Sequence, residues 1–223
     1  MIKLVAKKLV RNISNNIISK SCRITNNTII VNDKLLFENN NVPYNVFIKN
    51  AYKKYINNYP KFFKMDNLSK LGIIAVELLS DEFKSIDGKE IGVVLVNSAS
   101  SLDADQTFQK TIVKDNYFPS PSVFVYTLPN IVIGEICIKH KIYGESSFFV
   151  SQNFDSTFIY NIVCDLFSRQ GINTAIVGWL DFIDNDYLAS LCIIKKISQQ
   201  NLNYNEMINF TIENLNKTIN KDI

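Results

Sequence analysis

Three short apolar runs constrain the fold of this chain more than any other feature. They cover residues 91–96, 174–177 and 189–194, and apolar and polar residues do not alternate regularly in them. A strand without alternation is typical of a sheet that helices cover on both faces. Segments with helical periodicity separate the runs. The sequence therefore predicts an α/β fold in which a mixed, mostly parallel sheet is layered between helices.

Apolar residues at helical spacing, together with capping residues, locate the expected helices. We expect them over about residues 45–58, from Asp66 to about Ser80, from Asp103 to about Lys114, from Pro129 to near His140, from Asp155 to Gly171, and from near Asn203 onward. The helix after Pro129 is so apolar that it should be buried nearly all round. Further strands are expected at 28–31, 123–126 and 148–150, the first followed by an Asn-Asp turn.

The composition is that of an ordinary globular protein. Of 223 residues, 47% are apolar and 20% are charged, and the net charge is +3. This length is enough for one sizeable core or two small ones. The basic stretch from Lys3 to Arg11 is interleaved with apolar residues, so it favours a half-buried strand or helix over a nucleic-acid site. No apolar run reaches the roughly 18 residues of a membrane span, and the first residues do not resemble a signal peptide. We therefore expect a cytoplasmic protein.

Residue types that bind metals or act as nucleophiles form no familiar motif in the sequence. The cysteines lack the pairing of zinc sites and lie mostly in apolar runs, so we expect reduced, buried thiols at Cys22, Cys137, Cys164 and Cys192. The acidic group Asp181, Asp184 and Asp186 matches no calcium loop and predicts a solvated turn. Neither a phosphate-binding loop nor a Ser-His-Asp order is present. We expect no metal and no cofactor.

The order of short motifs between Lys64 and Asp181 resembles the N-terminal half of the β-ketoacyl synthases, which are part of the thiolase-like superfamily. The matching positions are Lys64-Met65-Asp66 before a core helix, Gly92-Val93-Val94 in a strand, Pro119-Ser120, Pro129-Asn130 and Gly134 around the next helix, Gly144 before a strand, and Gly178, after which Trp179 replaces a second glycine. The resemblance covers residues 62–195. It implies a single thiolase-like domain over 1–223, half of a full synthase, with a variable part at 1–60 and a closing helix and tail at 196–223.

The residue at the nucleophile position departs from the family pattern. Nine residues after the glycine that matches Gly144, an active synthase has the Cys of a Thr-Ala-Cys motif, whereas this chain has Asn153. A carboxamide cannot form a thioester. The family's catalytic histidines belong to a C-terminal half that this sequence does not contain, and its one histidine, His140, precedes the elbow. The resemblance therefore implies no catalytic residue and no condensing activity for the chain by itself.

Each of these residues also has a simpler interpretation. Gln152 and Asn153 resemble the carboxamide of chain-length-factor subunits, but they also suit an ordinary turn in which the Asn helps to cap the helix that begins near Asp155. His140 is expected to be a cation of a last helical turn or a solvated side chain instead of a general base. Cys164 lies about three helical turns past Asn153 and is expected to be a core residue.

The resemblance also implies a partner. In the family, the strand before the elbow pairs with its counterpart across a dimer axis, and the Pro-Asn helix packs beside it. The corresponding candidates for an interface or an acyl tunnel are Phe124, Tyr126, Thr127, Pro129, Asn130, Phe148, Phe149 and Val150, with Gln152 near the tunnel end. The partner would be an intact ketosynthase, which brings an acyl carrier protein to the complex, or a second copy of this chain. We expect neither nucleic acid nor a membrane as a partner.

The resemblance thus implies a non-condensing subunit of the chain-length-factor type. It would pair with an active ketosynthase in carrier-protein-dependent fatty-acid-like, polyketide or aryl polyene biosynthesis. One alternative is a malonyl-carrier-protein decarboxylase or acyl transferase in which Gln152 or Asn153 aids an oxyanion, although no histidine pair follows the elbow. Another alternative is a homodimeric acyl-binding or structural protein.

Overall fold

The computed structural model describes residues 16–169, 171–184, 186–197 and 208–220. One sheet has the strand order β3-β2-β1-β9-β8-β4-β7, and β10 pairs with β1 beside this path. Its strands are β1 (Asn16–Thr25), β2 (Thr28–Val31), β3 (Lys34–Glu38), β4 (Ile91–Asn97), β7 (Ser146–Val150), β8 (Thr174–Ile183), β9 (Asp186–Lys196) and β10 (Ile208–Asn209). The basic stretch from Lys3 to Arg11 lies outside the described residues.

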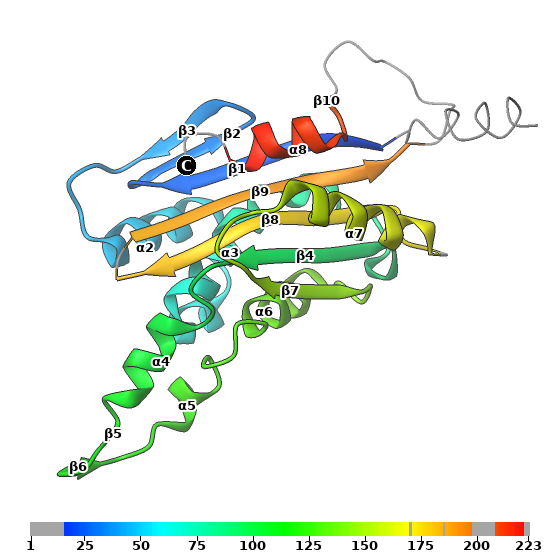
Figure 1. The fold of residues 1–223 in the computed structure, drawn as a ribbon. Helices are drawn as coiled ribbons and strands as arrows, with labels where there is room; N and C mark the ends of the chain where they lie inside the picture. Colours follow the sequence, from blue (N-terminus) through cyan, green and yellow to red (C-terminus); the bar gives the residue numbers. More distant parts are fainter. Residues whose placement is uncertain (1–15, 170, 185, 198–207, 221–223) are drawn as a thin grey trace, which may run out of the picture.

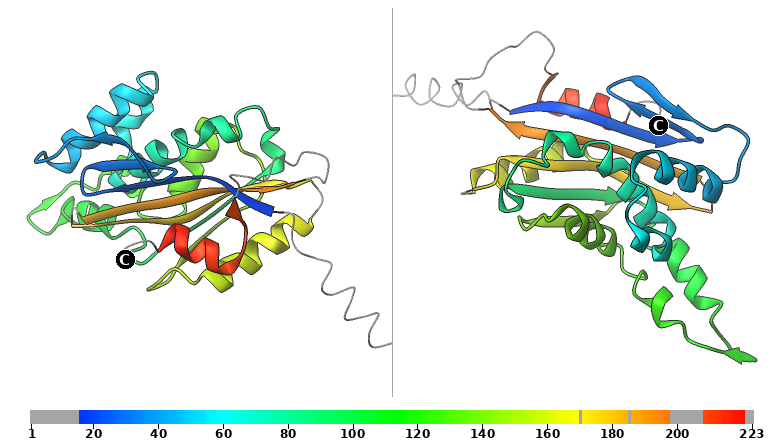
Figure 2. Two further views of the ribbon diagram at one scale, coloured as in Figure 1. Left: turned by 90° about the horizontal axis from the view of Figure 1, so that it is seen from above. Right: turned by 180° about the vertical axis from the view of Figure 1, so that it is seen from behind.

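Helices cover both faces of this sheet (Figure 1). The helices are α2 (Tyr44–Tyr55), α3 (Asn67–Glu77), α4 (Leu102–Gln109), α5 (Pro121–Phe124), α6 (Ile131–His140), α7 (Ser156–Ser168) and α8 (Ile212–Ile219), with short 3-10 turns η1 (Pro60–Lys64), η2 (Ser80–Glu82) and η3 (Gly88–Glu90). The helices α2, α3 and α6 pack on one face, and α7 and α8 pack on the other (Figure 2). No described helix is long and apolar enough to cross a membrane.

The sheet is mixed, and its central strands mostly run in one direction. β4 is parallel to both β7 and β8, whereas β9 is antiparallel to both of its neighbours, β8 and β1. Because β9 lies between them, β1 and β8 point the same way. The pairs that join β1, β2 and β3 are antiparallel as well. The layered α/β fold with a mixed sheet is confirmed. The expectation that the sheet is mostly parallel is wrong, because five of its described strand pairs are antiparallel and two are parallel.

Alternate residues of the central strands face two separate cores. Val93 and Leu95 of β4 contact the core under α2, α3 and α6, whereas Val94 and Val96 contact the core under α7 and α8. All of β4 is buried. Covering both faces removes the need for polar alternation, and burying each such side chain contributes roughly 1.5–3 kcal/mol. The structure thus explains the apolar run at 91–96.

Carboxylate caps start two of the core helices as the sequence predicts. The Asp66 side chain accepts a hydrogen bond from Ser69 N at 3.0 Å, where α3 begins. The Asp155 side chain accepts bonds from Thr157 N at 2.9 Å and Phe158 N at 3.0 Å, where α7 begins. Such a cap satisfies backbone donors that the first helical turn leaves free. Both helices lie against the strands that carry the candidate site.

Two other helices differ from the sequence prediction. α4 begins at Leu102 and ends at Gln109, so Asp103 lies in its first turn and does not cap it. The expected helix after Pro129 is not buried all round, because it packs on the sheet with one face only and leaves Ile138 64% exposed.

The final helix is also shorter than predicted. α8 begins at Ile212, and the Thr211 hydroxyl caps it by accepting from Asn214 N at 3.1 Å. Ile208 belongs to β10, which pairs with β1 and cannot be part of a helix. Asn203, where the sequence predicts the helix to start, lies outside the described residues.

Residues 98–130 form a projecting arm. It consists of α4, the two-stranded ribbon of β5 (Ile112–Val113) and β6 (Asn116–Tyr117), and α5, and it extends away from the sheet (Figure 1). The strand predicted at 123–126 is wrong, because Pro121 starts the one-turn helix α5 there. Proline is well suited to a first helical turn, and a run of four apolar residues does not by itself distinguish strand from helix.

β8 continues beyond the point where the sequence predicts it to end. Gly178 lies in mid-strand with φ of 155°, and a Cβ there would be 2.1 Å from the Ser190 carbonyl oxygen of β9. The strand then passes through Asp181, which is 7% exposed, so the prediction of a solvated turn is wrong for this residue. Asp184 and Asp186 are exposed at the turn between β8 and β9, as predicted.

Candidate functional site

The carboxyl ends of β4 and β7 lie side by side because the two strands are parallel. Asn97, the last residue of β4, is opposite Val150, the last residue of β7. The Ser151 N–H donates to the Asn97 carbonyl oxygen at 2.8 Å, so the loops that follow the two strands start together. Ligand sites of α/β sheets characteristically form at this edge. Asn153, which occupies the position of the family's nucleophile, belongs to the loop after β7.

Gln152 and Asn153 are exposed in that loop. Asn153 lies three residues before the first residue of α7, so it is outside the helix and does not cap it. Phe154, the next residue, is buried in the core under α7 and α8. Its burial directs the chain from the loop into α7. The structure therefore presents the Asn153 carboxamide to solvent at the strand-to-helix junction. This geometry is compatible with a degenerate elbow, and the capping role belongs to Asp155.

The amino end of α7 already carries a negative group. The Asp155 carboxylate bonds two of the first amides of the helix, at Thr157 and Phe158. In an elbow that performs acyl transfer, such amides stabilise a thiolate or an oxyanion. Here they are paired with a side-chain carboxylate, whose charge disfavours a second anion beside it. The electrostatics of this junction agree with the loss of a nucleophile at position 153.

Asp181 is a site residue that the sequence analysis misplaced. Its carboxylate accepts from Ser98 N at 3.1 Å, from Ser98 Oγ at 2.5 Å and from Ala99 N at 3.3 Å. It also accepts from Phe182 N at 3.1 Å. A buried carboxylate needs such donors to offset the cost of leaving water. Asp181 therefore fastens the loop after β4 to β8, next to the candidate elbow.

A second network joins the base of the arm. The Asn97 side chain donates to the Ser100 carbonyl oxygen at 2.8 Å and accepts from Ser100 N at 3.0 Å. Ser101 is buried, and its hydroxyl donates to the Thr127 carbonyl oxygen at 2.8 Å. The polar run at 98–101 directly after a buried strand is the sequence signal that points to this network, because buried strand ends need hydrogen-bond partners.

His140 lies in the last turn of α6, on the face of the sheet opposite α7. Burial, and to a smaller extent Lys139, lowers the pKa of His140 from 6.5 to about 4. The side chain is 9% exposed, and its Nε2 lies 3.7 Å from a carboxylate oxygen of Glu77. The prediction of a cationic or solvated histidine is therefore wrong, because a buried imidazole with this pKa is neutral at pH 7. His140 also lies on the other face of the sheet from α7, which follows the loop with Asn153.

All four cysteines are free, and none is activated. Burial raises the pKa of both Cys22 and Cys192 to about 12 and that of Cys137 to about 11, and it also raises the pKa of Cys164. A thiol becomes a nucleophile only as a thiolate. Cys164 is partly buried against the core under α7, as expected for a packing residue. Within the described ranges, no group of three or more His, Cys, Asp or Glu side chains could hold a metal ion.

The interface candidates fall into two neighbouring groups. Phe124, Tyr126, Thr127, Pro129 and Asn130 belong to the arm, where Phe124 is 58% exposed and the Tyr126 side chain is buried. The second group is β7, the last strand at its edge of the sheet. In β7, Phe148 packs toward α6, Phe149 packs against Phe158 of α7 at 5.0 Å between ring centroids, and Val150 is 54% exposed.

Four cavities in the described part of the chain lie away from the junction between β7 and α7. They have volumes of about 400–590 Å³ and are lined by residues of β1, β2, β3, α2, the end of α3, β9, β10 and α8. None of these four reaches Asn153 or the arm. These four cavities therefore do not form an acyl-sized tunnel at the elbow. Of the proposed tunnel residues, Phe124 and Gln152 are exposed, Thr127 and Phe149 are partly buried, and Tyr126 is buried.

Comparison with known proteins identifies the fold. No family model matches the sequence, and no curated protein matches it. Among solved structures, the ishigamide ketosynthase/chain length factor superposes with a TM-score of 0.59 at 12% identity over 84% of this chain. A ketosynthase in complex with its chain length factor from Xenorhabdus doucetiae gives 0.52 at 10% identity over 82%. A type II polyketide acyl-carrier protein in complex with its ketosynthase gives 0.57 at 11% identity over 81%.

These likenesses confirm the predicted ketosynthase-like, thiolase-like fold. The chain spans only 63% of the ishigamide chain and 62% of the carrier-protein-bound ketosynthase chain, but 79% of the Xenorhabdus doucetiae chain. At such identities the similarity extends to architecture alone.

Proposed function

We propose that this chain is a cytoplasmic, non-condensing ketosynthase-like subunit of the chain-length-factor type. It forms a heterodimer with an active ketosynthase and takes part in carrier-protein-dependent synthesis of a fatty-acid-like, polyketide or aryl polyene product. One observation carries the proposal: an exposed carboxamide, Asn153, occupies the strand-to-helix junction of a ketosynthase-like fold. An amide cannot attack a thioester, so the acyl chain is held by the partner.

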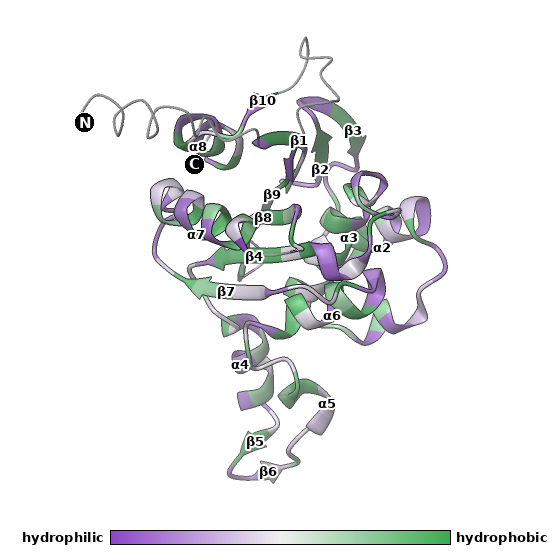
Figure 3. Cartoon of the chain, turned by 90° about the vertical axis from the view of Figure 1, so that its right-hand side faces the viewer, coloured by the Kyte–Doolittle hydropathy of each residue, from purple (hydrophilic) through white to green (hydrophobic). Residues whose placement is uncertain are grey.

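The distribution of exposed apolar side chains supports a partner. Of 17 large apolar residues exposed in the described part of the chain, 11 lie between Leu102 and Phe158. They are Leu102, Val113, Tyr117, Phe118, Phe124, Val125, Leu128, Ile138, Tyr143, Val150 and Phe158. Figure 3 shows hydrophobic residues along β5, α5 and β7. Apolar surface gathered on neighbouring elements in this way is typical of a protein interface.

The free edge of β7 adds a second argument. In the described part of the chain, β7 pairs on one side only, with β4. An unpaired edge strand offers a row of backbone donors and acceptors to another chain. If a strand of the ketosynthase pairs with β7, the elbow of the ketosynthase comes close to Val150 and to the loop with Asn153. The subunit then supplies a wall of the partner's acyl tunnel, for which Phe124, Thr127, Phe149 and Gln152 are available.

Co-expression with the ketosynthase encoded nearest to it in the genome tests this function. We expect a stable one-to-one complex by size-exclusion chromatography with light scattering. After incubation with malonyl- and acyl-loaded carrier protein, intact-mass spectrometry should find the acyl group on the ketosynthase and none on this chain. A monomer or homodimer that binds no ketosynthase contradicts the heterodimer. An acyl adduct on this chain contradicts the assignment as a non-condensing subunit.

A further inference from the structure

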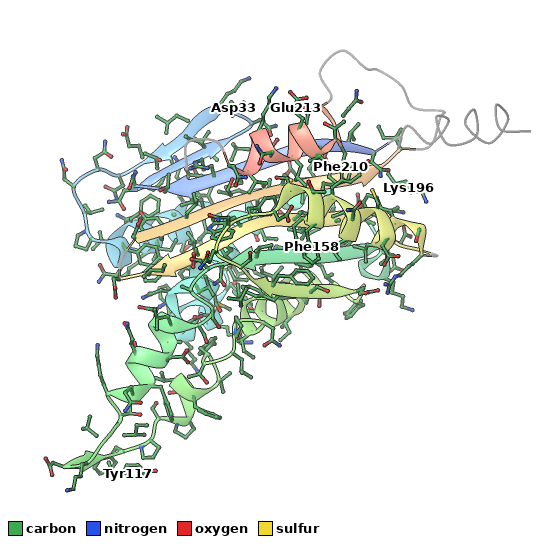
Figure 4. All side chains as sticks on the ribbon, in the orientation of Figure 1. Asp33, Tyr117, Phe158, Lys196, Phe210 and Glu213 are labelled. Atoms are coloured by element: carbon green, nitrogen blue, oxygen red, sulfur yellow. The ribbon has the colours of Figure 1, made fainter. Side chains whose placement is uncertain are left out.

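The far end of the projecting arm carries two of the three most exposed aromatic side chains of the described residues. Tyr117 and Phe118 are 67% and 77% exposed, and Tyr117 lies at the arm's tip in Figure 4. Within the arm, the rings of Phe108 and Phe124 pack at 5.2 Å between centroids, although Phe124 is 58% exposed. An extended segment with so few buried contacts swings easily unless its base is fixed. Its position therefore depends on the bonds at its two ends.

The outgoing end of the arm is tied to β8. The buried Asp181 carboxylate accepts three hydrogen bonds from the first two arm residues: from the Ser98 N–H, the Ser98 hydroxyl and the Ala99 N–H. Bonds to a charged acceptor are among the stronger ones in proteins. They orient the chain as it leaves β4, one strand away from Asp181.

The returning end of the arm is tied to α6 and η1. The Tyr126 hydroxyl donates to the Glu135 carboxylate at 3.1 Å, and the other carboxylate oxygen pairs with Lys61 Nζ at 2.5 Å. Tyr126 and Glu135 are 9% and 5% exposed. Burial, with the nearby Glu135 charge, raises the pKa of Tyr126, so its hydroxyl remains a donor at all ordinary pH values. Glu135 thus links Tyr126 of the arm to Lys61 of η1, an element that precedes the arm in the sequence.

The two ends are also joined to each other. The buried Ser101 hydroxyl of the outgoing end donates to the Thr127 carbonyl oxygen of the returning end at 2.8 Å. A continuous series of bonds therefore joins β8, the two ends of the arm, α6 and η1. Two buried carboxylates, Asp181 and Glu135, take part in it, one at each end of the arm.

We propose that Asp181 and Glu135 are positioning residues that clamp the base of the arm, so that Tyr117 and Phe118 are presented in a fixed orientation to the partner subunit. A surface that is ordered before binding loses less entropy on association. The identity of the partner rests on the proposed function, whereas the clamp itself does not. The partner surface that suits this tip is an apolar groove that accepts two aromatic rings.

Hydrogen–deuterium exchange on the full chain tests the clamp. Tyr126→Phe removes the bond to Glu135 and leaves the Lys61 pair intact, and Ser98→Ala removes one bond to Asp181 at an exposed residue. We expect each variant to speed exchange of the α4 amides about tenfold, and the double variant to speed it further. Exchange in β4 should stay unchanged. The control is Tyr143→Phe, which removes a hydroxyl from a side chain that is 69% exposed and outside the arm.

Partner binding provides the second readout. The double variant should raise the dissociation constant for the co-expressed ketosynthase about tenfold, because the arm must then be ordered on binding. If the unaltered chain binds no ketosynthase, the proposed function fails while the exchange data still decide the clamp. The clamp is overturned if α4 of the unaltered chain exchanges like an unstructured peptide, if the double variant leaves α4 exchange unchanged, or if β4 accelerates equally. Should the double variant not fold, Ser98→Ala decides.

Discussion

At the scale of single residues, position 153 fixes which chemistry the elbow can perform. The carboxamide of Asn153 is readable from the sequence, and the absence of a thiol follows from it directly. The hydrogen bonds around Asn153, in contrast, are decided by the structure. The capping role that the sequence assigned either to Asn153 or to Asp155 belongs to Asp155, because only this carboxylate reaches the first amides of α7.

Replacing the cap and replacing the exposed amide should therefore have different effects. Asp155→Ala should lower the free energy of unfolding by about 1 kcal/mol, because two helix amides lose their acceptor. Asn153→Ala should change it by less than about 0.5 kcal/mol, since the side chain is exposed and outside the helix. Urea unfolding followed by circular dichroism measures both. Equal losses would show that Asn153 has a structural role that its exposed position does not reveal.

His140 should make stability depend on pH. Its pKa of about 4 in the folded chain lies below its usual 6.5. Between these values the unfolded chain binds a proton that the folded chain does not bind, so stability falls as the pH is lowered. Asp66 has the opposite effect, because burial raises its pKa from 3.8 to about 6, and the folded chain then takes up the proton. The two effects partly offset each other.

The histidine contribution can be isolated with a matched variant. Between about pH 7.5 and pH 5, the unaltered chain should lose roughly 2 kcal/mol more stability than His140→Gln, which cannot titrate. Urea unfolding at both pH values gives the difference. Because the chain contains one histidine, its imidazole signals in an NMR titration are unambiguous. A midpoint near 6.5 would contradict the buried, neutral assignment.

At the scale of elements, local sequence located the central strands and the starts of α3 and α7. It failed where the environment decides, as at 123–126, where Pro121 and the arm produce a helical turn, and at Ile138, which the sheet leaves uncovered. A short apolar run or a highly apolar helix does not reveal how much of its surface neighbouring elements cover. β8 was predicted too short because Gly178 was taken as its end.

The pairing of β8 with β9 supplies a test at this scale. Gly178→Ala should lower the free energy of unfolding by at least about 2 kcal/mol, because its Cβ would meet the Ser190 carbonyl oxygen at 2.1 Å. Gly134→Ala is the matched control in the middle of α6, where no heavy atom lies within 4 Å of the new Cβ. It should raise stability by up to about 1 kcal/mol. Similar losses in both variants would contradict the close approach of the strands.

At the scale of the whole molecule, the sheet has two opposite edges, and only one lies beside the arm. β7 ends the sheet next to the exposed apolar residues of the arm, whereas β3 ends it at the other side with Leu35 59% exposed. The order of the strands, and hence this asymmetry, arises from contacts between segments far apart in the chain. The sequence resemblance named β7 as the interface, and the structure shows that β7 is a free edge among the described residues.

Charge placed on each edge should reveal which edge binds the partner. Val150→Lys on β7 should abolish the complex with the ketosynthase, because a buried, unpaired ammonium group costs several kcal/mol. Leu35→Lys on β3 is the matched control and should leave the complex intact. Both positions are more than half exposed, so neither variant should lose thermal stability. Loss of the complex only in the β3 variant would place the interface on the opposite edge.

The amino-acid sequence by itself determined the covalent chemistry and the local patterns of this protein. An amide stands in place of a thiol at position 153, apolar runs without alternation specify doubly covered strands, and Asp66 and Asp155 mark helix starts. These features depend on residue type and on near neighbours in the chain. The tertiary structure alone decided that Asp181 is buried under Ser98, that His140 is neutral, and that the arm projects beside a free strand edge. These three features depend on contacts between segments that are far apart in the sequence. Such contacts decide which side chains are shielded from water, and no local sequence pattern encodes them.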